Sequence, residues 1–382
     1  MNVKILPAIL GIVLILVILG DAFETIVLPR RVTRRVRLAR LFFRYTWLPW
    51  SALLRWISSG NRRETYLSFY GPLSLLLLLM IWATGLIFGF ALLQLASGSV
   101  TDGARGIPSF GTHLYFSGTT FFTLGLGDVA PHTRMARGLT ALEAGVGFGF
   151  LALVIGYLPA LTQSFSRREV NISLLDARGG SPPTAAEMLR RHSHDHGLEQ
   201  LQQLLSDWEL WSAELLESHL SYPVLAYFRS QHDNQSWLGA LTAILDTSAF
   251  VMAEVEGSCE RQADLTFAIA RHAVVDLSLI FRRPPRAPEK DRLPPAQLEH
   301  LRATLAASGL RIRRESAADQ KLLELRQMYE PYVNSLSRYL AMALPPWIPG
   351  AGPADNWQTS AWGDDSGPQR ADFPRGSAGR HF

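Results

Sequence analysis

The feature that most constrains this chain is a short peptide in which glycine alternates with larger residues, placed between two long apolar runs. The peptide reads Thr-Leu-Gly-Leu-Gly-Asp and covers Thr123 to Asp128. Because glycine adopts backbone angles that other residues avoid, such a strand can turn successive carbonyl groups toward one axis. Four such strands around an axis would stack rings of oxygen atoms that replace the water around a dehydrated cation. One peptide per chain therefore implies four identical chains.

The residues before this peptide predict the element that supports it. Thr112 to Phe122 is long enough for a short helix of about three turns. We expect this helix to re-enter the membrane with its carbonyl end pointing inward, where its partial negative charge favours cations. The backbone carbonyls and one hydroxyl of the first filter residues are then the expected ion ligands: Thr123, Leu124, Gly125 and Leu126.

This stretch resembles the pore of the potassium-channel superfamily, whose filters read Thr-Val-Gly-Tyr-Gly-Asp. The matching positions are Thr123, Gly125, Gly127 and Asp128. Leu126 stands at the family's tyrosine, where it can pack behind the filter but cannot hydrogen-bond to the pore helix. Phe122 replaces a common threonine. The resemblance implies a homotetramer that conducts potassium ions. Because of the two departures, it implies the pore fold more strongly than it implies strict potassium selectivity.

Apolar composition predicts an all-α membrane protein with three spans. They cover residues 5–28, 69–96 and 139–161; each is near or above the length of about 20 residues that crosses the hydrocarbon core. Ten arginines and no acidic residue lie between Arg30 and Arg63, and the positive-inside rule places such a stretch in the cytoplasm. We therefore expect a plasma-membrane protein, or an inner-membrane protein if the source is bacterial, with the N-terminus outside and the C-terminus in the cytoplasm.

The chain divides into five predicted parts. They are a first transmembrane helix (1–29), a basic amphipathic cytoplasmic segment (30–68), a pore domain (69–165), a helical cytosolic domain (166–346) and a disordered tail (347–382). The single cysteine, Cys259, excludes an internal disulfide framework. The net charge of +4 does not indicate a nucleic-acid partner, because the basic residues cluster beside the membrane spans.

Arginines that recur every third residue in the basic segment allow two interpretations. A voltage-sensing helix has this spacing, but it needs further spans to shield its charges, and one span precedes this segment. The favoured interpretation is an amphipathic helix on the inner surface that binds lipid headgroups. Four aromatic residues are its expected interfacial anchors: Tyr45, Trp47, Trp50 and Trp56.

Several single residues of the membrane part have candidate roles. Asp128 can attract cations at the outer mouth or hold the filter by hydrogen bonds. Glu143 is expected to pack behind the filter near the pore helix, hydrogen-bonded. Gly147 stands where the resembling family has a bending point in its inner helix, and close packing is the alternative. Asp21 and Glu24, near the inner end of the first span, are expected to pair with arginines such as Arg30 or Arg31.

The C-terminal half has helical periodicity from Thr184 to about Leu344, with Asp176 to Pro183 as a linker. No glycine-rich nucleotide-binding motif follows a strand, so its ligand or partner stays unknown. His192, His194 and His196 form the one metal-like cluster, and a solvated linker before a helix is the alternative.

The predicted function is a tetrameric cation channel that needs no cofactor besides its permeant potassium ions. The alternative is a non-conducting or weakly selective signalling scaffold built on the same architecture, which the large helical half and the altered filter would suit. An enzyme finds no support, because no nucleophile or metalloprotease motif stands in or beside the spans.

Overall fold

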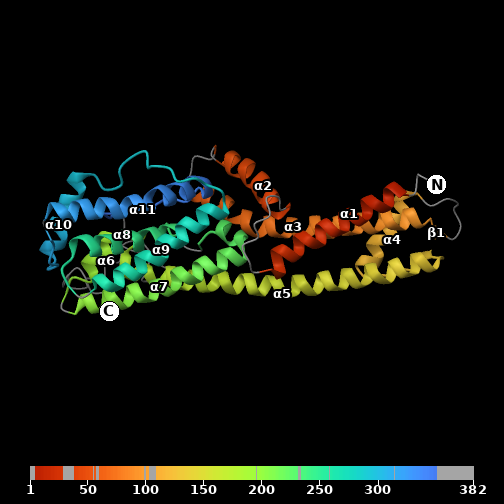
Figure 1. Cartoon of the computed structure of the whole chain (residues 1–382), viewed down its shortest axis with the longest axis horizontal. Coiled ribbons are helices and arrows are strands. Elements are labelled where there is room, and N and C mark those ends of the chain that lie inside the picture. The colour runs from red at the N-terminus through yellow and green to blue at the C-terminus, as the bar shows by residue number, and fades with distance from the viewer. Residues whose placement is uncertain are drawn as a thin grey trace, which may run out of the picture.

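The computed structural model describes residues 5–28, 38–54, 56, 60–98, 100–102, 109–194, 196–230, 234–257, 259–313 and 315–350. Its elements, in chain order, are α1 (Ile5–Ala22), η1 (Phe23–Val27), α2 (Leu38–Leu54), α3 (Gly60–Ser97), β1 (Val100–Asp102), α4 (Phe110–Phe121), β2 (Val129–Pro131), α5 (Arg134–Gly179), α6 (Ala185–Arg191), α7 (Gly197–Ser221), η2 (Pro223–Tyr227), α8 (Trp237–Glu254), α9 (Glu260–Ile280), α10 (Pro295–Ala307) and α11 (Ser316–Leu340). The molecule is elongated, with a membrane unit at one end and a bundle of helices at the other (Figure 1). The prediction of an all-α membrane protein is confirmed.

Three helices of the described chain are long and apolar enough to cross a membrane: Ile5–Val27, Arg62–Ser97 and Arg134–Gly179. The first two lie along one another through small residues. A Cβ on Gly11 would lie 2.7 Å from the Gly89 carbonyl oxygen, and one on Gly85 would overlap the Ile18 side chain. Gly85 and Gly89 are spaced as in the glycine pairs that let membrane helices approach closely.

The inner helix α5 is longer than predicted. The expected span ended at Leu161, but α5 continues as one helix to Gly179 and passes through the expected domain boundary at residue 166. Pro159 lies within α5 without ending it, and the helix stops at Gly179, after which Gly180 takes a φ of 80°. The expected linker is therefore shortened to residues 180–184, and α5 runs along both units (Figure 1).

The C-terminal bundle is built around α8, whose residues are all buried. Helices α7, α9 and α11 pack against it or against each other. The buried face of α7 contributes five large apolar residues to this core: Leu201, Leu204, Leu205, Trp208 and Trp211. The helical nature of this half agrees with its predicted periodicity.

One of the interfacial anchors predicted for helix α2 is buried inside the protein. Trp47 is 1% exposed and its indole nitrogen donates a 2.8 Å hydrogen bond to the Tyr339 carbonyl at the end of α11. Its ring packs against Tyr70 and Tyr227. The expectation that Trp47 is a lipid anchor is wrong, because the rings of Tyr70 and Tyr227 and the end of α11 bury it within the protein. Tyr45 and Trp56 remain exposed.

The predicted disordered tail begins too early. Trp347 is fully buried in the core of the bundle, and its carbonyl accepts a 3.1 Å hydrogen bond from the Ala186 amide. Burial of an indole removes a large apolar surface from water, and this gain in free energy outweighs the conformational entropy lost by the surrounding glycines and prolines. Trp347 therefore holds the chain at least to Gly350. Residues 351–382 lie outside the described residues.

Candidate functional site

Helix α4 is the predicted pore helix, and it begins and ends close to the expected positions. Ser109 caps its start, with its hydroxyl accepting a 3.3 Å hydrogen bond from the Thr112 amide. It packs between α3 and α5 and ends at Phe121. The chain then leaves helical geometry directly into the glycine-alternating peptide, so the carbonyl end of α4 adjoins that peptide.

The peptide from Thr123 to Asp128 has an alternating backbone. Thr123, Gly125 and Gly127 have φ angles of 59°, 56° and 79°. Glycine reaches this left-handed region without a steric penalty, whereas the conformation costs Thr123 about 1–2 kcal/mol. The Thr119 carbonyl holds the start of the peptide, accepting hydrogen bonds from the Leu124 and Gly125 amides at 2.7 and 3.4 Å.

Asp128 is held at the end of the peptide by hydrogen bonds. Its carboxylate accepts a bond from the Tyr115 hydroxyl at 3.0 Å and one from the Val129 amide at 3.1 Å. Tyr115 lies on α4, so this bond ties the pore helix to the outer end of the filter. The structural role considered for Asp128 thus has geometric support. Sequence reasoning missed Tyr115, because no spacing rule fixes which side of the pore helix meets the returning chain.

A short antiparallel pair holds the chain beyond Asp128. Strand β2 pairs with β1, with Val129 opposite Asp102 and Pro131 opposite Val100. The peptide that leaves the filter is therefore anchored to the connection that follows α3. This anchoring limits how far the outer end of the filter can move.

Glu143 is fully buried where α5 packs against α4, and its predicted position behind the filter stays a prediction. Its carboxyl group contacts the Ser117 hydroxyl on α4, and that hydroxyl also lies 2.7 Å from the Ile87 carbonyl of α3. A serine hydroxyl has one hydrogen, and both neighbours are acceptors when the carboxyl is ionised. Both contacts are satisfied if the carboxyl carries a proton and donates to Ser117, while Ser117 donates to Ile87. This chain of hydrogen bonds joins the outer helix, pore helix and inner helix.

Gly147 lies where α5 packs against the end of the pore helix. A Cβ at this position would overlap the Phe121 carbonyl oxygen, well inside van der Waals contact. The helix is regular through this residue. The packing alternative therefore has direct support, and the role of Gly147 as a bending point stays a prediction.

The apolar side chains of the filter peptide have few neighbours within one chain. Phe122, Leu124 and Leu126 are 60%, 63% and 65% exposed. Large apolar side chains grouped in this way are typical of surfaces that meet another protein or lipid. Leu126, at the family's tyrosine position, is therefore packed little by its own chain.

Asp21 has partners within the chain that were not predicted. Asp21 accepts hydrogen bonds from the Ala39 amide at 3.0 Å and the Trp82 indole at 3.0 Å, and so caps the start of α2. Its predicted partners Arg30 and Arg31 lie outside the described residues.

The three histidines do not converge on one point. His192 is buried with Nδ1 against the Met188 carbonyl, His194 contacts the Arg191 carbonyl, and His196 lies 3.5 Å from Glu199. Within the described residues no group of three histidine, cysteine or acidic side chains could hold a metal ion.

Comparison with known proteins assigns the membrane part. Residues 75–163 match a protein-family model described as "Ion channel". The chain is also 24% identical over 201 residues to "Uncharacterized membrane protein YdjJ" of Bacillus subtilis (strain 168), an alignment that covers 51% of this chain and 58% of that protein. The chain thus spans less than two thirds of that relative. No solved structure shows a significant match. Residues 75–163 therefore match an ion-channel domain.

Proposed function

We propose that four copies of this chain assemble around their filter peptides and conduct cations passively, with potassium as the permeant ion. The carbonyl oxygens of Thr123, Leu124, Gly125 and Leu126, together with the Thr123 hydroxyl, would replace the water around each ion. Because the ligands are mainly backbone dipoles, the reaction is dehydration matched by oxygen contacts and involves no covalent step.

The alternating backbone of residues 123–127 is the observation that carries this proposal. Positive φ angles at every second residue, directly after a pore helix, are what a peptide needs to turn successive carbonyls to one side. A loop with no such task would have no reason to hold Thr123 in a region that costs it free energy. The bond between Tyr115 and Asp128 then keeps this backbone in place.

The exposed apolar surface supports assembly around an axis. Besides the filter side chains, α5 exposes Phe148, Leu151 and Ile155 at 55–69%. Lipid can cover some of this surface, but lipid cannot cover the filter, whose irregular backbone is tolerated at membrane depth where protein or an ion path surrounds it. Copies of the chain would supply that protein.

A non-conducting signalling scaffold is the second candidate. The observation that favours it is Leu126, which has no hydroxyl to hold the filter against a pore helix. The same helix α5 that would line a pore also continues into a large helical bundle, which suits a protein whose output is carried by that bundle.

Reconstitution into liposomes separates the two candidates. We expect barium-sensitive potassium flux from the intact protein, and a reversal potential in mixed potassium and sodium that favours potassium. Gly125→Ala should lower the flux at least tenfold, because alanine is strained at a φ of 56°. Gly20→Ala is the matched control, since a Cβ there meets no atom within 4 Å.

Two outcomes would contradict the channel. One is a protein that remains a monomer or dimer in detergent and in lipid. The other is an intact tetramer with no barium-sensitive flux, which would favour the scaffold. Equal loss of flux in Gly20→Ala and Gly125→Ala would remove the link between conduction and the filter backbone.

A further inference from the structure

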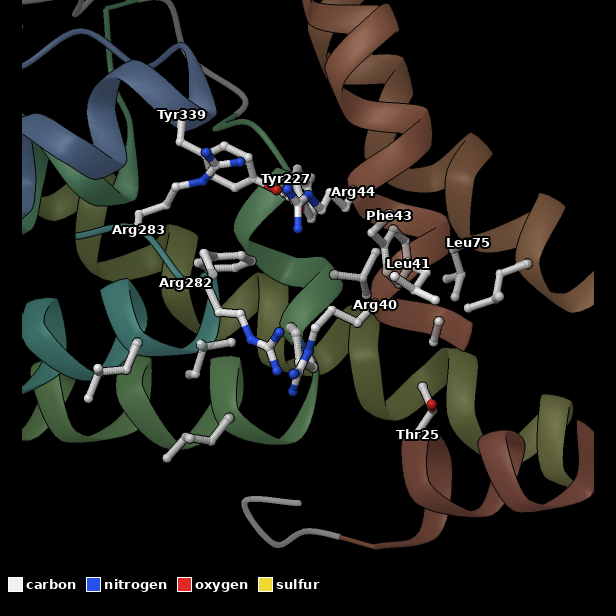
Figure 2. Close-up of a pocket in the computed structure, with 18 of the residues that line it drawn as sticks. Thr25, Arg40, Leu41, Phe43, Arg44, Leu75, Tyr227, Arg282, Arg283 and Tyr339 are labelled. Atoms are coloured by element: carbon white, nitrogen blue, oxygen red, sulfur yellow. Dashed lines mark hydrogen bonds between the residues drawn. The ribbon is translucent and has the colours of Figure 1, made fainter. Parts of the chain in front are cut away.

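A cavity of about 320 Å³ lies at the junction of the membrane unit and the helical bundle. Its walls come from α2, α3 and α5 on one side, and from η2, the end of α9 and α11 on the other (Figure 2). None of the roles described above uses this space. The question is which ligand its two kinds of wall would hold.

One wall is strongly basic. Arg40 and Arg44 come from α2, and Arg282 and Arg283 follow the end of α9. Figure 2 shows the side chains of Arg40 and Arg282 extending toward one another across the cavity. Asp276 is the acidic residue among the described lining residues, and it pairs with His272 at 3.3 Å. Four guanidinium groups and one carboxylate therefore line this wall.

The arginines are positioned by packing as well as by charge. The guanidinium of Arg283 lies over the Tyr339 ring, 3.9 Å from its centroid, and Tyr339 in turn bonds Tyr227 through their hydroxyls at 2.7 Å. A guanidinium that is already oriented loses little rotamer entropy when an anion binds. The basic wall is therefore partly preorganised.

The other wall is apolar and belongs to the membrane spans. It includes Leu75 and Leu78 of α3 and Tyr157 of α5, all of which lie in candidate spans. Leu279 of α9 adds a leucine that is 65% exposed. A ligand that fills the cavity would therefore meet arginines at one end and hydrocarbon at the other.

We propose that this cavity binds an anionic phospholipid, with its phosphate between the arginines and the upper part of its acyl chains against the apolar wall. Arginine is suited to phosphate because its planar fork of donors bonds two oxygens at once. A free phosphate or a nucleotide would leave the apolar wall wet, whereas a lipid covers both walls. The bilayer also delivers anionic lipid to the level of Leu75 and Leu78 without a path through water.

The bound lipid would bridge the two units. Its headgroup would contact α2 and the segment after α9, and its chains would contact α5, the helix that would line the pore. Lipid occupancy should therefore stabilise the junction between the bundle and the membrane unit. This inference concerns binding at the junction, and it holds whether or not the filter conducts.

The test measures lipid binding to the delipidated full chain in neutral detergent, by native mass spectrometry and by the shift in Tm. Phosphatidylglycerol, phosphatidylcholine of the same acyl chains, and inorganic phosphate are compared. We expect phosphatidylglycerol to bind at least tenfold more tightly than phosphatidylcholine, and inorganic phosphate to give no shift. The double variant Arg40→Gln/Arg282→Gln should bind phosphatidylglycerol roughly thirtyfold more weakly, since each arginine near an anionic lipid contributes about 1 kcal/mol.

The matched control is Arg261→Gln/Arg271→Gln, which removes two exposed arginines from helix α9. Its binding should equal that of the unchanged protein. Equal loss in both double variants would overturn the site, and so would unchanged binding in Arg40→Gln/Arg282→Gln. A Tm shift from inorganic phosphate equal to that from phosphatidylglycerol would overturn the lipid as the ligand.

A second measurement needs no variant. Phosphatidylglycerol with a photoreactive group on its acyl chain should cross-link to residues 75–78 and 279–280 in the unchanged protein. Cross-links confined to the outward faces of α1 and α3 would overturn the proposal even if the double variant fails to fold. Both readouts are independent of ion flux, so the channel can fail its own test while this site stands.

Discussion

The hydrogen bonds around Glu143 show how one buried side chain can join three membrane helices. Ser117 stands between the carboxyl group and the Ile87 carbonyl, and its single hydrogen allows one direction of donation along the chain. Glu143→Gln should therefore leave assembly intact and change stability by less than about 1 kcal/mol, because the amide can donate to Ser117 as the protonated carboxyl does. Size-exclusion chromatography with light scattering and the Tm would measure this.

The contrasting variant at the same position is Glu143→Ala. It leaves a cavity where a fully buried side chain stood, so it should lower the Tm by several degrees. The opposite result, in which Glu143→Gln loses the assembled form and Glu143→Ala keeps it, would contradict the inferred hydrogen-bond directions. Those directions run from Glu143 to Ser117 and from Ser117 to the Ile87 carbonyl.

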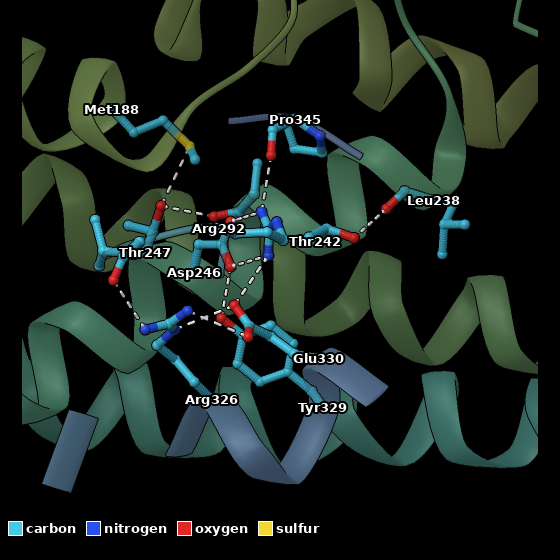
Figure 3. Close-up of polar contacts among 12 residues, drawn as sticks. Met188, Leu238, Thr242, Asp246, Thr247, Arg292, Arg326, Tyr329, Glu330 and Pro345 are labelled. Atoms are coloured by element: carbon cyan, nitrogen blue, oxygen red, sulfur yellow. Dashed lines mark hydrogen bonds and ion pairs between the residues drawn. The ribbon is translucent and has the colours of Figure 1, made fainter. Parts of the chain in front are cut away.

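Asp246 is the centre of a buried polar network in the bundle (Figure 3). Its carboxylate accepts hydrogen bonds from Arg292 at 2.6 and 3.1 Å and from the Tyr329 hydroxyl at 2.5 Å, and its side chain has no exposed surface. Arg292 also contacts Glu330 at 3.4 Å and the Pro345 carbonyl at 2.8 Å. The network therefore joins α8, α11 and the segment that leads to Trp347.

Removing Asp246 leaves Arg292 buried without its main partner. We expect Asp246→Ala to lower the free energy of unfolding by about 3–5 kcal/mol. Asp264→Ala is the control, because Asp264 pairs with Arg261 at the surface and both side chains are more than half exposed; its cost should be below about 1 kcal/mol. Denaturant unfolding followed by circular dichroism measures both, and equal costs would contradict a structural role for the network.

At the scale of helices, Arg168 fastens α5 to the bundle. Its guanidinium donates to the Leu225 and Phe228 carbonyls, both at 2.9 Å, and to Glu169 at 2.9 Å. His219 of α7 lies beside it, with Nε2 3.4 Å from Arg168 and Nδ1 2.8 Å from the Leu215 carbonyl. These contacts fit the tautomer in which Nδ1–H donates to the Leu215 carbonyl and the unprotonated Nε2 faces the Arg168 guanidinium. The junction therefore needs His219 in its neutral form.

This arrangement predicts a pH dependence of stability. Burial first, and then the charge of Arg168, lower the pKa of His219 to about 3. Between that value and the ordinary pKa of 6.5, the unfolded chain binds a proton that the folded chain excludes. Stability should therefore fall as the pH drops below about 6.5, by about 1.4 kcal/mol per pH unit from this residue. Tm measurements from about pH 4.5 to 7.5 test this slope.

The comparison variant is His219→Asn, whose amide can still donate to Leu215 but takes up no proton. Its Tm should fall less steeply below about pH 6.5 than that of the unchanged protein. His300→Asn, at an exposed position of α10, should leave the slope unchanged. Parallel slopes in all three proteins would show that His219 titrates normally in the folded state.

The elements also show what could be predicted from the sequence. The short helix α4, the alternating backbone after it and the three spans were predictable, because apolar length and the glycine alternation act locally. The continuation of α5 to Gly179, the burial of Trp47 and the docking of Trp347 were not predictable. Each depends on contacts between segments that lie far apart in the chain, as in the bond from Trp47 to Tyr339. Tyr115 was missed for the same reason.

At the scale of the whole molecule, the two units share one hydrophobic core. Trp47, Leu67 and Tyr70 of α2 and α3 belong to the same cluster as the buried residues of the bundle. Tyr227 is the central contact, with its ring beside Trp47, Tyr70 and Tyr339. Because helix α5 and the core are both continuous across the junction, the bundle and the membrane unit would move together as one rigid body.

This shared core predicts that α2 couples the two units. Trp47→Ala should cost about 3–5 kcal/mol, because it removes a fully buried indole and its hydrogen bond to Tyr339. Loss of that contact should also raise hydrogen exchange in α2 and at the end of α11 more than in α8, whose residues are all buried inside the bundle. Trp56→Ala is the matched control, since Trp56 is 90% exposed. If exchange rose evenly through the bundle, Trp47 would be an ordinary core residue; a rise confined to α2 and α11 would identify it as the link between the bundle and the membrane unit.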